Sequence, residues 1–311
     1  MAISPDFRIF VINLDRCPDR MRSMDAQLAK FNLSYARIAA VDGDSKGLSR
    51  EIDALGARVL PHRRRQLSGR EIGCYLSHLK AFEALEASGA AAAIILEDDV
   101  ILDVKFKRAV QALAARFSTE PVVVKMETWK KKRLGFVASR LKGFELIFAP
   151  HALTETGAYF ITSEAARQLR RELIAIQDAY DDALYKHRSG LVDVLTLSPP
   201  VARQSAQFLS MIEPGRTLMK GQALRRPVVL RELFRPLAQC ADVFMALLVT
   251  NRRFGWLAMA GLRRRNITIE ATRIRPQATG ATVRNAESPS RLARSFLHAP
   301  QALGSEAGLE G

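Results

Sequence analysis

The chain has 311 residues, and its 48% hydrophobic and 25% charged residues are the usage of an ordinary globular protein. It contains no apolar run near the roughly 20 residues that span a bilayer, and its N-terminus does not have the pattern of a secretory signal peptide. Three widely spaced cysteines match neither a zinc motif nor a disulfide framework, which favours a reducing compartment. We therefore expect a cytoplasmic protein.

Positive charge is concentrated at the C-terminal end. The formal net charge is +15, and from Arg216 onward there are 16 Arg and Lys residues against 6 Asp and Glu residues. Arginines alternate there with phenylalanine and tryptophan, which is typical of a basic amphipathic helix on an anionic membrane surface. The alternative is that this segment packs on the preceding domain. A nucleic-acid-binding protein would also explain the charge, but no DNA- or RNA-binding motif is present, so we expect no nucleic-acid partner.

Apolar strands and amphipathic helices alternate along the first two thirds of the sequence. The first strand, helix and second strand form a βαβ unit, which implies a parallel sheet. Gly89 is expected to end one helix and Ser163 to cap the start of another. The predicted strands cover 7–14, 35–41, 91–96, 121–126, 157–162 and 191–197, and the predicted helices cover 19–31, 70–88, 104–117 and 163–176.

Three regions follow from this pattern. Residues 1–215 predict an α/β domain with a Rossmann-like, mostly parallel sheet flanked by helices. Residues 216–270 predict a basic, amphipathic helical extension. Residues 271–311 contain few large apolar side chains and predict a disordered tail.

Three consecutive carboxylates, Glu97, Asp98 and Asp99, come directly after the apolar strand over 91–96. Ligands bind at the carboxyl ends of strands in α/β sheets, and a divalent cation would relieve the repulsion among adjacent carboxylates. Residues 97 and 99 lie on the same side of an extended segment, so both can bind one Mn²⁺ or Mg²⁺ that bridges a diphosphate. We expect Asp99 as the main metal ligand, Glu97 beside it and Asp98 toward the diphosphate. The alternative is a solvated turn before the next helix.

Six short segments occur in an order that resembles glycosyltransferase family 25, the lipopolysaccharide-biosynthesis galactosyltransferase-like family. The resemblance covers most of residues 7–213. It implies a GT-A-type α/β fold, a UDP-sugar donor, Mn²⁺ or a similar metal, and an inverting mechanism that gives a β-linkage. The segments are FVINLDRCPDR (10–20), SGREIGCYLSH (68–78), AIILEDDV (93–100), KMET (125–128), GAYFI (157–161) and TLSPPVARQSAQFLSMIE (196–213).

The resemblance places donor-binding residues on the first strand-to-helix connection. Asn13, Arg16 and Arg20 match the family's N-terminal motif, and the arginine fork suits phosphate because it is bidentate and always charged. The alternative for the two arginines is a surface pair at helical i, i+4 spacing. Asp42, at the end of the next predicted strand, is placed to contact ribose or uracil, unless it only forms an Asp-Gly turn.

The second matching segment is a helix with few polar positions. Glu71 and His78 are polar residues on its otherwise apolar surface, and both are predicted to contact the donor. The alternative for His78 is a hydrogen-bonded packing residue. Cys74 is expected to be a small buried apolar side chain.

An inverting transferase needs a general base that takes the proton from the attacking acceptor hydroxyl. Asp181 and Asp182 match a family position that follows the GAYFI strand and its helix, and adjacent carboxylates can raise one pKa. The family pattern has a single Asp there, so the sequence does not choose between them, and the alternative is an exposed helix start. Glu127 is the second candidate, as base or as acceptor ligand.

The predicted function is transfer of a hexose, galactose or glucose, from a UDP-sugar to a lipopolysaccharide core or another surface glycan. The acceptor would be lipid-linked or an oligosaccharide, and the basic extension would hold the protein on the inner face of the membrane. The alternative is a non-catalytic protein that binds a nucleotide-sugar or a polyanion.

Overall fold

The computed structural model describes residues 7–61, 66–127, 133–148, 155–186, 192–205 and 264–267. Residues 264–267 are the only described part of the predicted helical extension. The rest of that extension, the predicted tail and the predicted domain boundary at 215 lie outside the described residues. Their organisation and membrane contact therefore stay predictions. Within the described ranges, no helix is long and apolar enough to cross a membrane.

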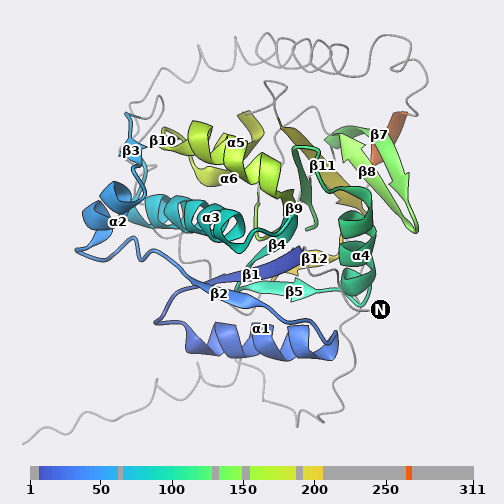
Figure 1. Cartoon of the computed structure of the whole chain (residues 1–311), viewed down its shortest axis with the longest axis horizontal. Helices are drawn as coiled ribbons and strands as arrows, with labels where there is room; N and C mark the ends of the chain where they lie inside the picture. Colours follow the sequence, from blue (N-terminus) through green and yellow to red (C-terminus); the bar gives the residue numbers. More distant parts are fainter. Residues whose placement is uncertain are drawn as a thin grey trace, which may run out of the picture. The chain divides into compact units, whose positions relative to one another are not determined.

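A nine-stranded sheet forms the centre of the described fold (Figure 1). Its strands are β1 (Phe7–Asn13), β2 (Ala36–Ala39), β4 (Ala92–Glu97), β6 (Val122–Lys125), β7 (Arg133–Leu141), β8 (Phe144–Phe148), β9 (Ala158–Thr162), β11 (Asp193–Ser198) and β13 (Arg264–Ile267). They lie in the order β13-β7-β8-β11-β6-β9-β4-β1-β2. β9, β8 and β13 run opposite to the other six strands, so the sheet is mostly parallel, as predicted.

Two short strand pairs lie outside this sheet. They consist of β10 (Ala175–Ile176) with β3 (Arg58–Val59), and β12 (Ala202–Gln204) with β5 (Val100–Leu102). The second pair matters for the site, because β5 directly follows the acidic triplet at the end of β4 and carries β12 alongside it.

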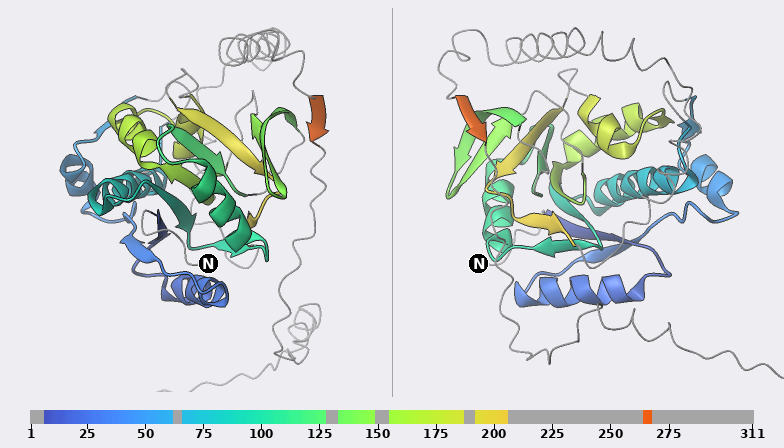
Figure 2. Two further views of the ribbon diagram at one scale, coloured as in Figure 1. Left: turned by 45° about the vertical axis from the view of Figure 1, so that its right-hand side comes forward. Right: turned by 180° about the vertical axis from the view of Figure 1, so that it is seen from behind.

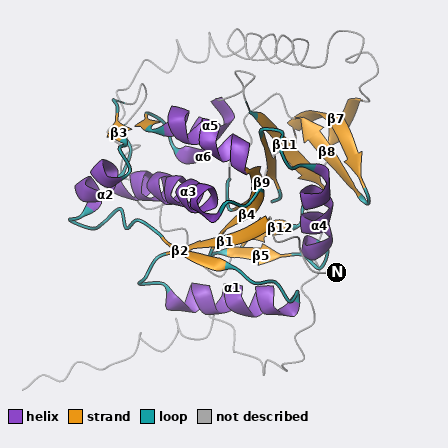
Figure 3. Cartoon of the chain, in the orientation of Figure 1, coloured by secondary structure: helices purple, strands orange, loops and turns teal. Residues whose placement is uncertain are grey.

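Helices cover both faces of the sheet (Figures 2 and 3). They are α1 (Pro18–Lys30), α2 (Leu48–Ala54), α3 (Gly69–Ser88), α4 (Phe106–Arg116), α5 (Ser163–Leu173) and α6 (Tyr180–Lys186). One apolar core lies between the sheet and α3, α5 and α6, and a second lies between the sheet and α1 and α4. Alternate residues of β1 enter different cores, Phe10 and Ile12 one, Ile9 and Val11 the other, as expected for a strand buried on both faces.

The helix ends follow local chemistry. Ser68 caps α3 in a reciprocal pair with Glu71, and Gly89 ends the helix at φ 65°, as predicted. The predicted cap of α5 is wrong by one residue, because Thr162 and not Ser163 accepts the hydrogen bond from the Ala165 amide, at 3.3 Å. The Thr162 hydroxyl also donates to the Glu120 carbonyl at 2.7 Å, so it ties the start of α5 to the segment before β6.

The hairpin of β7 and β8 was not predicted, and neither was β13. β13 comes from the segment predicted as a helical extension, and its backbone pairs antiparallel with β7, with Arg264 opposite Phe136. Residues 264–267 therefore extend the sheet at its edge instead of belonging to a helix.

Three glycines allow the connection after β2 to touch α3. A Cβ at Gly73 would lie 2.6 Å from the Val41 carbonyl oxygen, and a Cβ at Gly43 would lie 2.1 Å from the Gly69 carbonyl oxygen. Neither glycine has a positive φ, so close approach of two backbones is the constraint. The Val41 amide also donates to the Ser77 hydroxyl at 2.8 Å, which fixes the register of this contact.

We predict that Gly73→Ala destabilises the protein, although alanine is the better helix former. The added methyl group must push α3 away from the connection after β2, and such overpacking lowers the free energy of unfolding by about 1–3 kcal/mol. Urea unfolding measures the effect. Gly47→Ala is the control, because its methyl group would meet only the Ser45 hydroxyl oxygen, at 3.4 Å, and should cost less than about 1 kcal/mol. A more stable Gly73→Ala protein would contradict the close contact.

Candidate active site

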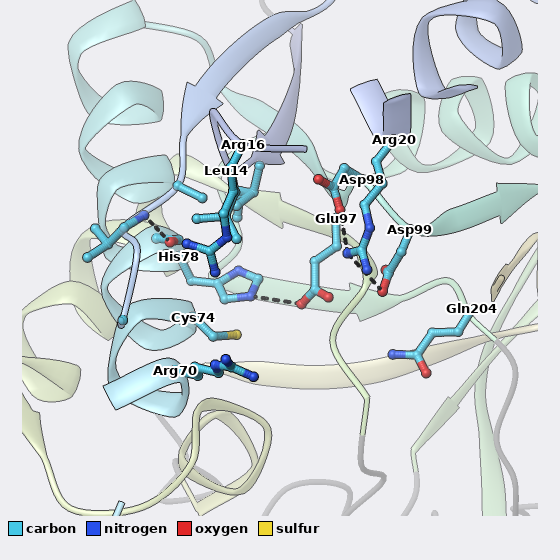
Figure 4. Close-up of a pocket in the computed structure, with 15 residues that line it drawn as sticks. Leu14, Arg16, Arg20, Arg70, Cys74, His78, Glu97, Asp98, Asp99 and Gln204 are labelled. Atoms are coloured by element: carbon cyan, nitrogen blue, oxygen red, sulfur yellow. Dashed lines mark hydrogen bonds and ion pairs between the residues drawn. The ribbon is translucent and has the colours of Figure 1, made fainter. Parts of the chain in front are cut away.

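A pocket lies at the carboxyl ends of β1 and β4, the edge of the sheet where the sequence predicts ligand binding (Figure 4). Its walls come from the β1–α1 connection, the segment after β2, one side of α3, the turn after β4, and β12. Polar side chains dominate the lining: Arg16, Arg20, Arg70, Cys74, Ser77, His78, Glu97, Asp98, Asp99 and Gln204.

Asp98 is held by groups of the protein itself. The Asn13 amide donates to Asp98 Oδ2 at 2.6 Å and to the Cys17 carbonyl at 2.9 Å, which joins the turn after β4 to the start of α1. Arg20 Nη1 lies 3.3 Å from Asp98 Oδ1. Burial raises the pKa of Asp98, while Asn13 and Arg20 oppose that rise. Asp98 is thus buried with its charge already compensated.

Asp99 is partly buried and lacks comparable compensation. Its Oδ1 is buried and has no hydrogen-bond partner among the described residues, and its nearest cation is Arg20, at 3.9 Å from Oδ2. Burial, reinforced by the negative charges of Glu97 and Asp98, raises the pKa of Asp99 to about 7. An orphaned carboxylate oxygen beside two further carboxylates fits a divalent cation with oxygen ligands.

Glu97 and His78 meet on the other side of the pocket. His78 Nε2 lies 3.3 Å from Glu97 Oε1, and His78 Nδ1 lies 2.9 Å from the Tyr159 hydroxyl. The His78 ring is buried and stacks on Tyr180, with centroids 3.9 Å apart. The structure thus brings the predicted metal ligands Glu97 and Asp99 and the predicted donor residue His78 into one pocket.

Two arginines line the pocket near α3. Arg16 forms an ion pair with Asp42 and lies 3.6 Å from Asp44, and Arg70 Nε lies 2.8 Å from Asp44. Asp42 does not line the pocket itself, and the structure connects it to the site through Arg16. The two guanidinium groups and Arg20 give the pocket cationic groups on both sides of the carboxylates.

Sequence reasoning missed Arg70 as a site residue and was wrong about Cys74. Cys74 is partly exposed and lines the pocket, whereas a buried apolar role was expected. The signal was present in the spacing, since residues 70, 74 and 78 lie one helical turn apart and share one side of α3. Gln204 was also missed, and it reaches the pocket because β12 pairs with β5.

Asn13 and Glu71 do not line the pocket. Asn13 is buried behind Asp98, and Arg37 Nε donates to its side-chain oxygen at 2.9 Å. The Glu71 carboxylate accepts from the amide and the hydroxyl of Ser68, at 3.0 and 3.1 Å, and closes the cap of α3. Both side chains hold elements that carry lining residues, and direct contact with a donor stays a prediction.

Glu127 lies beneath the pocket and is fully buried. Its Oε1 accepts from the Gly157 amide at 3.0 Å and lies 4.0 Å from Lys125 Nζ. The Gly157 carbonyl in turn accepts from the Glu97 amide at 2.7 Å. Burial raises the pKa of Glu127 well above its usual value. A carboxyl group that keeps its proton cannot accept one, so Glu127 is a poor base. Its hydrogen bond to Gly157 instead supports the backbone at Glu97.

Asp181 and Asp182 lie at the start of α6, next to Tyr180, which stacks on His78. Asp181 is half-buried, and its negative charge acts to raise the pKa of Lys125, against the larger lowering by burial. Asp182 is exposed. Neither is among the lining residues of the pocket. Contact with a bound acceptor therefore stays a prediction for both, and the exposure of Asp182 favours Asp181.

We predict that Asp99→Asn stabilises the metal-free protein at neutral and alkaline pH. Native Asp99 keeps its proton up to about pH 7, whereas the unfolded chain loses it near 3.8. The native state therefore binds more protons between these values, and the free energy of unfolding falls as pH rises through them. Asparagine has no such loss, so the gain in the free energy of unfolding grows above pH 4 and levels off above pH 7, at on the order of 4 kcal/mol.

Thermal unfolding in chelator across this pH range measures the gain. If Asp99 is a metal ligand, as the sequence predicts, Mn²⁺ should reverse the order above pH 7, because only the wild-type protein would keep that ligand. A variant that is less stable than wild type at every pH would contradict the buried, uncompensated charge at this position.

Comparisons with known proteins identify the family of the chain. The sequence model of the family described as "Glycosyltransferase family 25 (LPS biosynthesis protein)" matches residues 7–184. Procollagen galactosyltransferase 1 of Danio rerio is 34% identical over 110 residues, and the inactive glycosyltransferase 25 family member 3 of Homo sapiens is 37% identical over 110 residues. Each match covers 34% of this chain and 18% of the relative, so the chain spans about a fifth of the length of these curated relatives.

Among solved structures, a glycosyltransferase involved in the glycosylation of the major capsid of PBCV-1 overlaps with a TM-score of 0.34 and 7% identity, over 65% of this chain and 94% of that chain. The family match is the stronger finding, because it covers more than half of the chain and includes the pocket-lining residues of β1, α3 and β4. The chain belongs to glycosyltransferase family 25.

Proposed function

We propose that the chain transfers a hexose, galactose or glucose, from a UDP-sugar to a glycan acceptor in a metal-dependent, inverting reaction. The observation that carries this proposal is the pocket, which is lined by three arginines and three carboxylates, one of which has a buried, unpartnered oxygen. A diphosphate needs cationic partners, and the carboxylates can accept the divalent ion that accompanies it. The galactosyltransferase named among the relatives supports a galactose donor.

Different residues of the pocket would bind the metal and the phosphates of the donor. Glu97 and Asp99 would hold Mn²⁺ or Mg²⁺, which when bound offsets the charge that develops on the departing diphosphate. Arg16 and Arg70, on the α3 side of the pocket, suit the phosphates as bidentate donors. Asp98 keeps Arg20 and Asn13 in place, so it acts on the donor through its neighbours.

The proposed chemistry needs one base. The acceptor oxygen forms a bond to the anomeric carbon, and the bond from that carbon to the diphosphate oxygen breaks with its electron pair on UDP. The hydroxyl proton passes to a carboxylate, for which we propose Asp181, since α6 begins beside His78 and Asp181 is half-buried. Glu127 is the weaker choice, because burial keeps it protonated.

The acceptor follows from the family alone. We propose a lipopolysaccharide core or another surface glycan, lipid-linked or as an oligosaccharide, because the family description names lipopolysaccharide biosynthesis. The inner face of the membrane is the proposed place of action, with the basic residues after 216 as the contact. A relative named inactive supports a second candidate, a protein that binds the donor without turnover.

We predict that UDP raises the thermal stability of the protein only when Mn²⁺ is present. A ligand at 100 times its dissociation constant stabilises by about 2.7 kcal/mol, which corresponds to roughly 5–10 °C. GDP, CMP and ADP should give smaller shifts, and Asp99→Asn should remove the Mn²⁺-dependent part. The proposed donor would be overturned if none of the four nucleotides raised the thermal stability, or if all four raised it equally.

We predict that Asp181→Asn lowers turnover of a UDP-hexose by about 10²–10⁴-fold, since that is the usual contribution of a general base. The stabilisation by UDP and Mn²⁺ should persist, because the donor pocket is intact. Asp182→Asn is the matched control on the next, exposed residue of α6, and its turnover should stay within about threefold of wild type. If the control loses as much turnover as Asp181→Asn, the base is not Asp181. If wild type binds UDP without any turnover, the non-catalytic candidate holds.

A further inference from the structure

We propose that Cys74, His78 and Glu97 form a second cation site, one that selects a borderline-soft ion such as Zn²⁺ and shares Glu97 with the carboxylate site. The thiol sulfur, a ring nitrogen and a carboxylate oxygen of these residues all lie within 4.8 Å of one another. Cys74 and His78 lie one turn apart on α3, and Glu97 ends β4 opposite them (Figure 4). Two rigid elements therefore hold the ligand atoms together.

The separation of two ligands already matches a tetrahedral ion. Zn–N and Zn–O bonds of about 2.0–2.1 Å place neighbouring ligand atoms about 3.3–3.4 Å apart. His78 Nε2 and Glu97 Oε1 are 3.3 Å apart. The Cys74 sulfur lies within 4.8 Å of the other two ligand atoms and is partly exposed in the pocket, where Zn–S bonds of about 2.3 Å would be needed. The cation would lie between Nε2 and Oε1.

A neighbouring tyrosine is compatible with the ligating form of His78. Its Nδ1 lies 2.9 Å from the Tyr159 hydroxyl, which in turn lies 3.0 Å from the Tyr180 hydroxyl. A proton on Nδ1 that is donated to Tyr159 leaves the lone pair on Nε2, which points at Glu97. Metal-ligating histidines ordinarily have such a partner on the second ring nitrogen, because it fixes the tautomer and the ring orientation.

The two ligand sets differ in chemical character. Sulfur and imidazole ligands favour Zn²⁺, whereas the carboxylates Glu97 and Asp99 favour Mn²⁺ or Mg²⁺. Glu97 belongs to both sets and cannot serve two ions fully at once. Zn²⁺ would therefore displace the ion that accompanies the donor, and this consequence, unlike Zn²⁺ binding itself, rests on the proposed function.

Cobalt titration of the full chain tests the site directly, since Co²⁺ takes Zn²⁺ positions and gives a near-ultraviolet charge-transfer band when a thiolate binds it. We expect the band in wild-type protein, its loss on addition of Zn²⁺, and its absence in Cys74→Ser. The band should persist in Asp99→Asn, which lacks the main ligand of the carboxylate site, and should weaken in Glu97→Gln.

Cys17→Ser and Cys240→Ser are the matched controls, because each removes another cysteine of the chain. Calorimetry should show Zn²⁺ affinity at least about 100-fold lower in Cys74→Ser and unchanged in both controls. Thermal unfolding of each variant in chelator checks that it is folded. A band that survives Cys74→Ser, or one that a control variant removes, would place the thiolate ligand elsewhere and overturn the proposal.

The competition is measured by the stability shift that UDP and Mn²⁺ give together. Zn²⁺ at a concentration that saturates the cobalt-defined site should abolish this shift in wild type, and Cys74→Ser should need at least about tenfold more Zn²⁺. An undiminished wild-type shift in saturating Zn²⁺ would overturn the competition. If wild type has no shift with UDP and Mn²⁺ but keeps the cobalt band, the proposed donor fails and the second cation site stands.

Discussion

The site depends on burial of negative charge at the end of β4. An apolar strand delivers three carboxylates to the sheet edge, where Asp98 is compensated by Asn13 and Arg20 while Asp99 keeps one buried, unpartnered oxygen. A buried ionised group is unfavourable unless it is paired, so the protein relieves the charge either by protonation or by a bound cation. The turn after β4 is therefore less stable than it could be, and the same feature is what supports the metal site proposed there.

α3 connects this charge to the rest of the pocket. Its C-terminal part is buried among apolar residues, whereas one side of its first turns presents Arg70, Cys74 and His78. The contact of Gly73 with the segment after β2 sets how closely the helix approaches. Because His78 also meets Glu97, the distance between α3 and β4 sets the geometry of the second cation site that we propose.

The pattern of the sequence was sufficient for the α/β class, for the main strands and helices, and for the place of Glu97 and Asp99. Periodicity and an acidic triplet after an apolar strand carry that information locally. β13 could not be found this way, since its pairing with β7 joins residues more than a hundred positions apart. The β7–β8 hairpin is local, with Leu141 opposite Phe144, and the periodicity analysis missed it. The sequence also did not indicate which carboxylates are buried. Glu71 caps a helix and Glu127 accepts a hydrogen bond from the Gly157 amide, although both lie in segments that match the family.

Glu127 shows why a matching segment does not assign a role. Its carboxyl binds the Gly157 amide, the Gly157 carbonyl binds the Glu97 amide, and Lys125 is buried close by. A buried acid and base ordinarily cost more than apolar residues of the same size would. Here the pair fixes the backbone at Glu97, the one side chain that borders both proposed cation positions. The buried Glu127 carboxyl thus supports the backbone of Glu97 through Gly157.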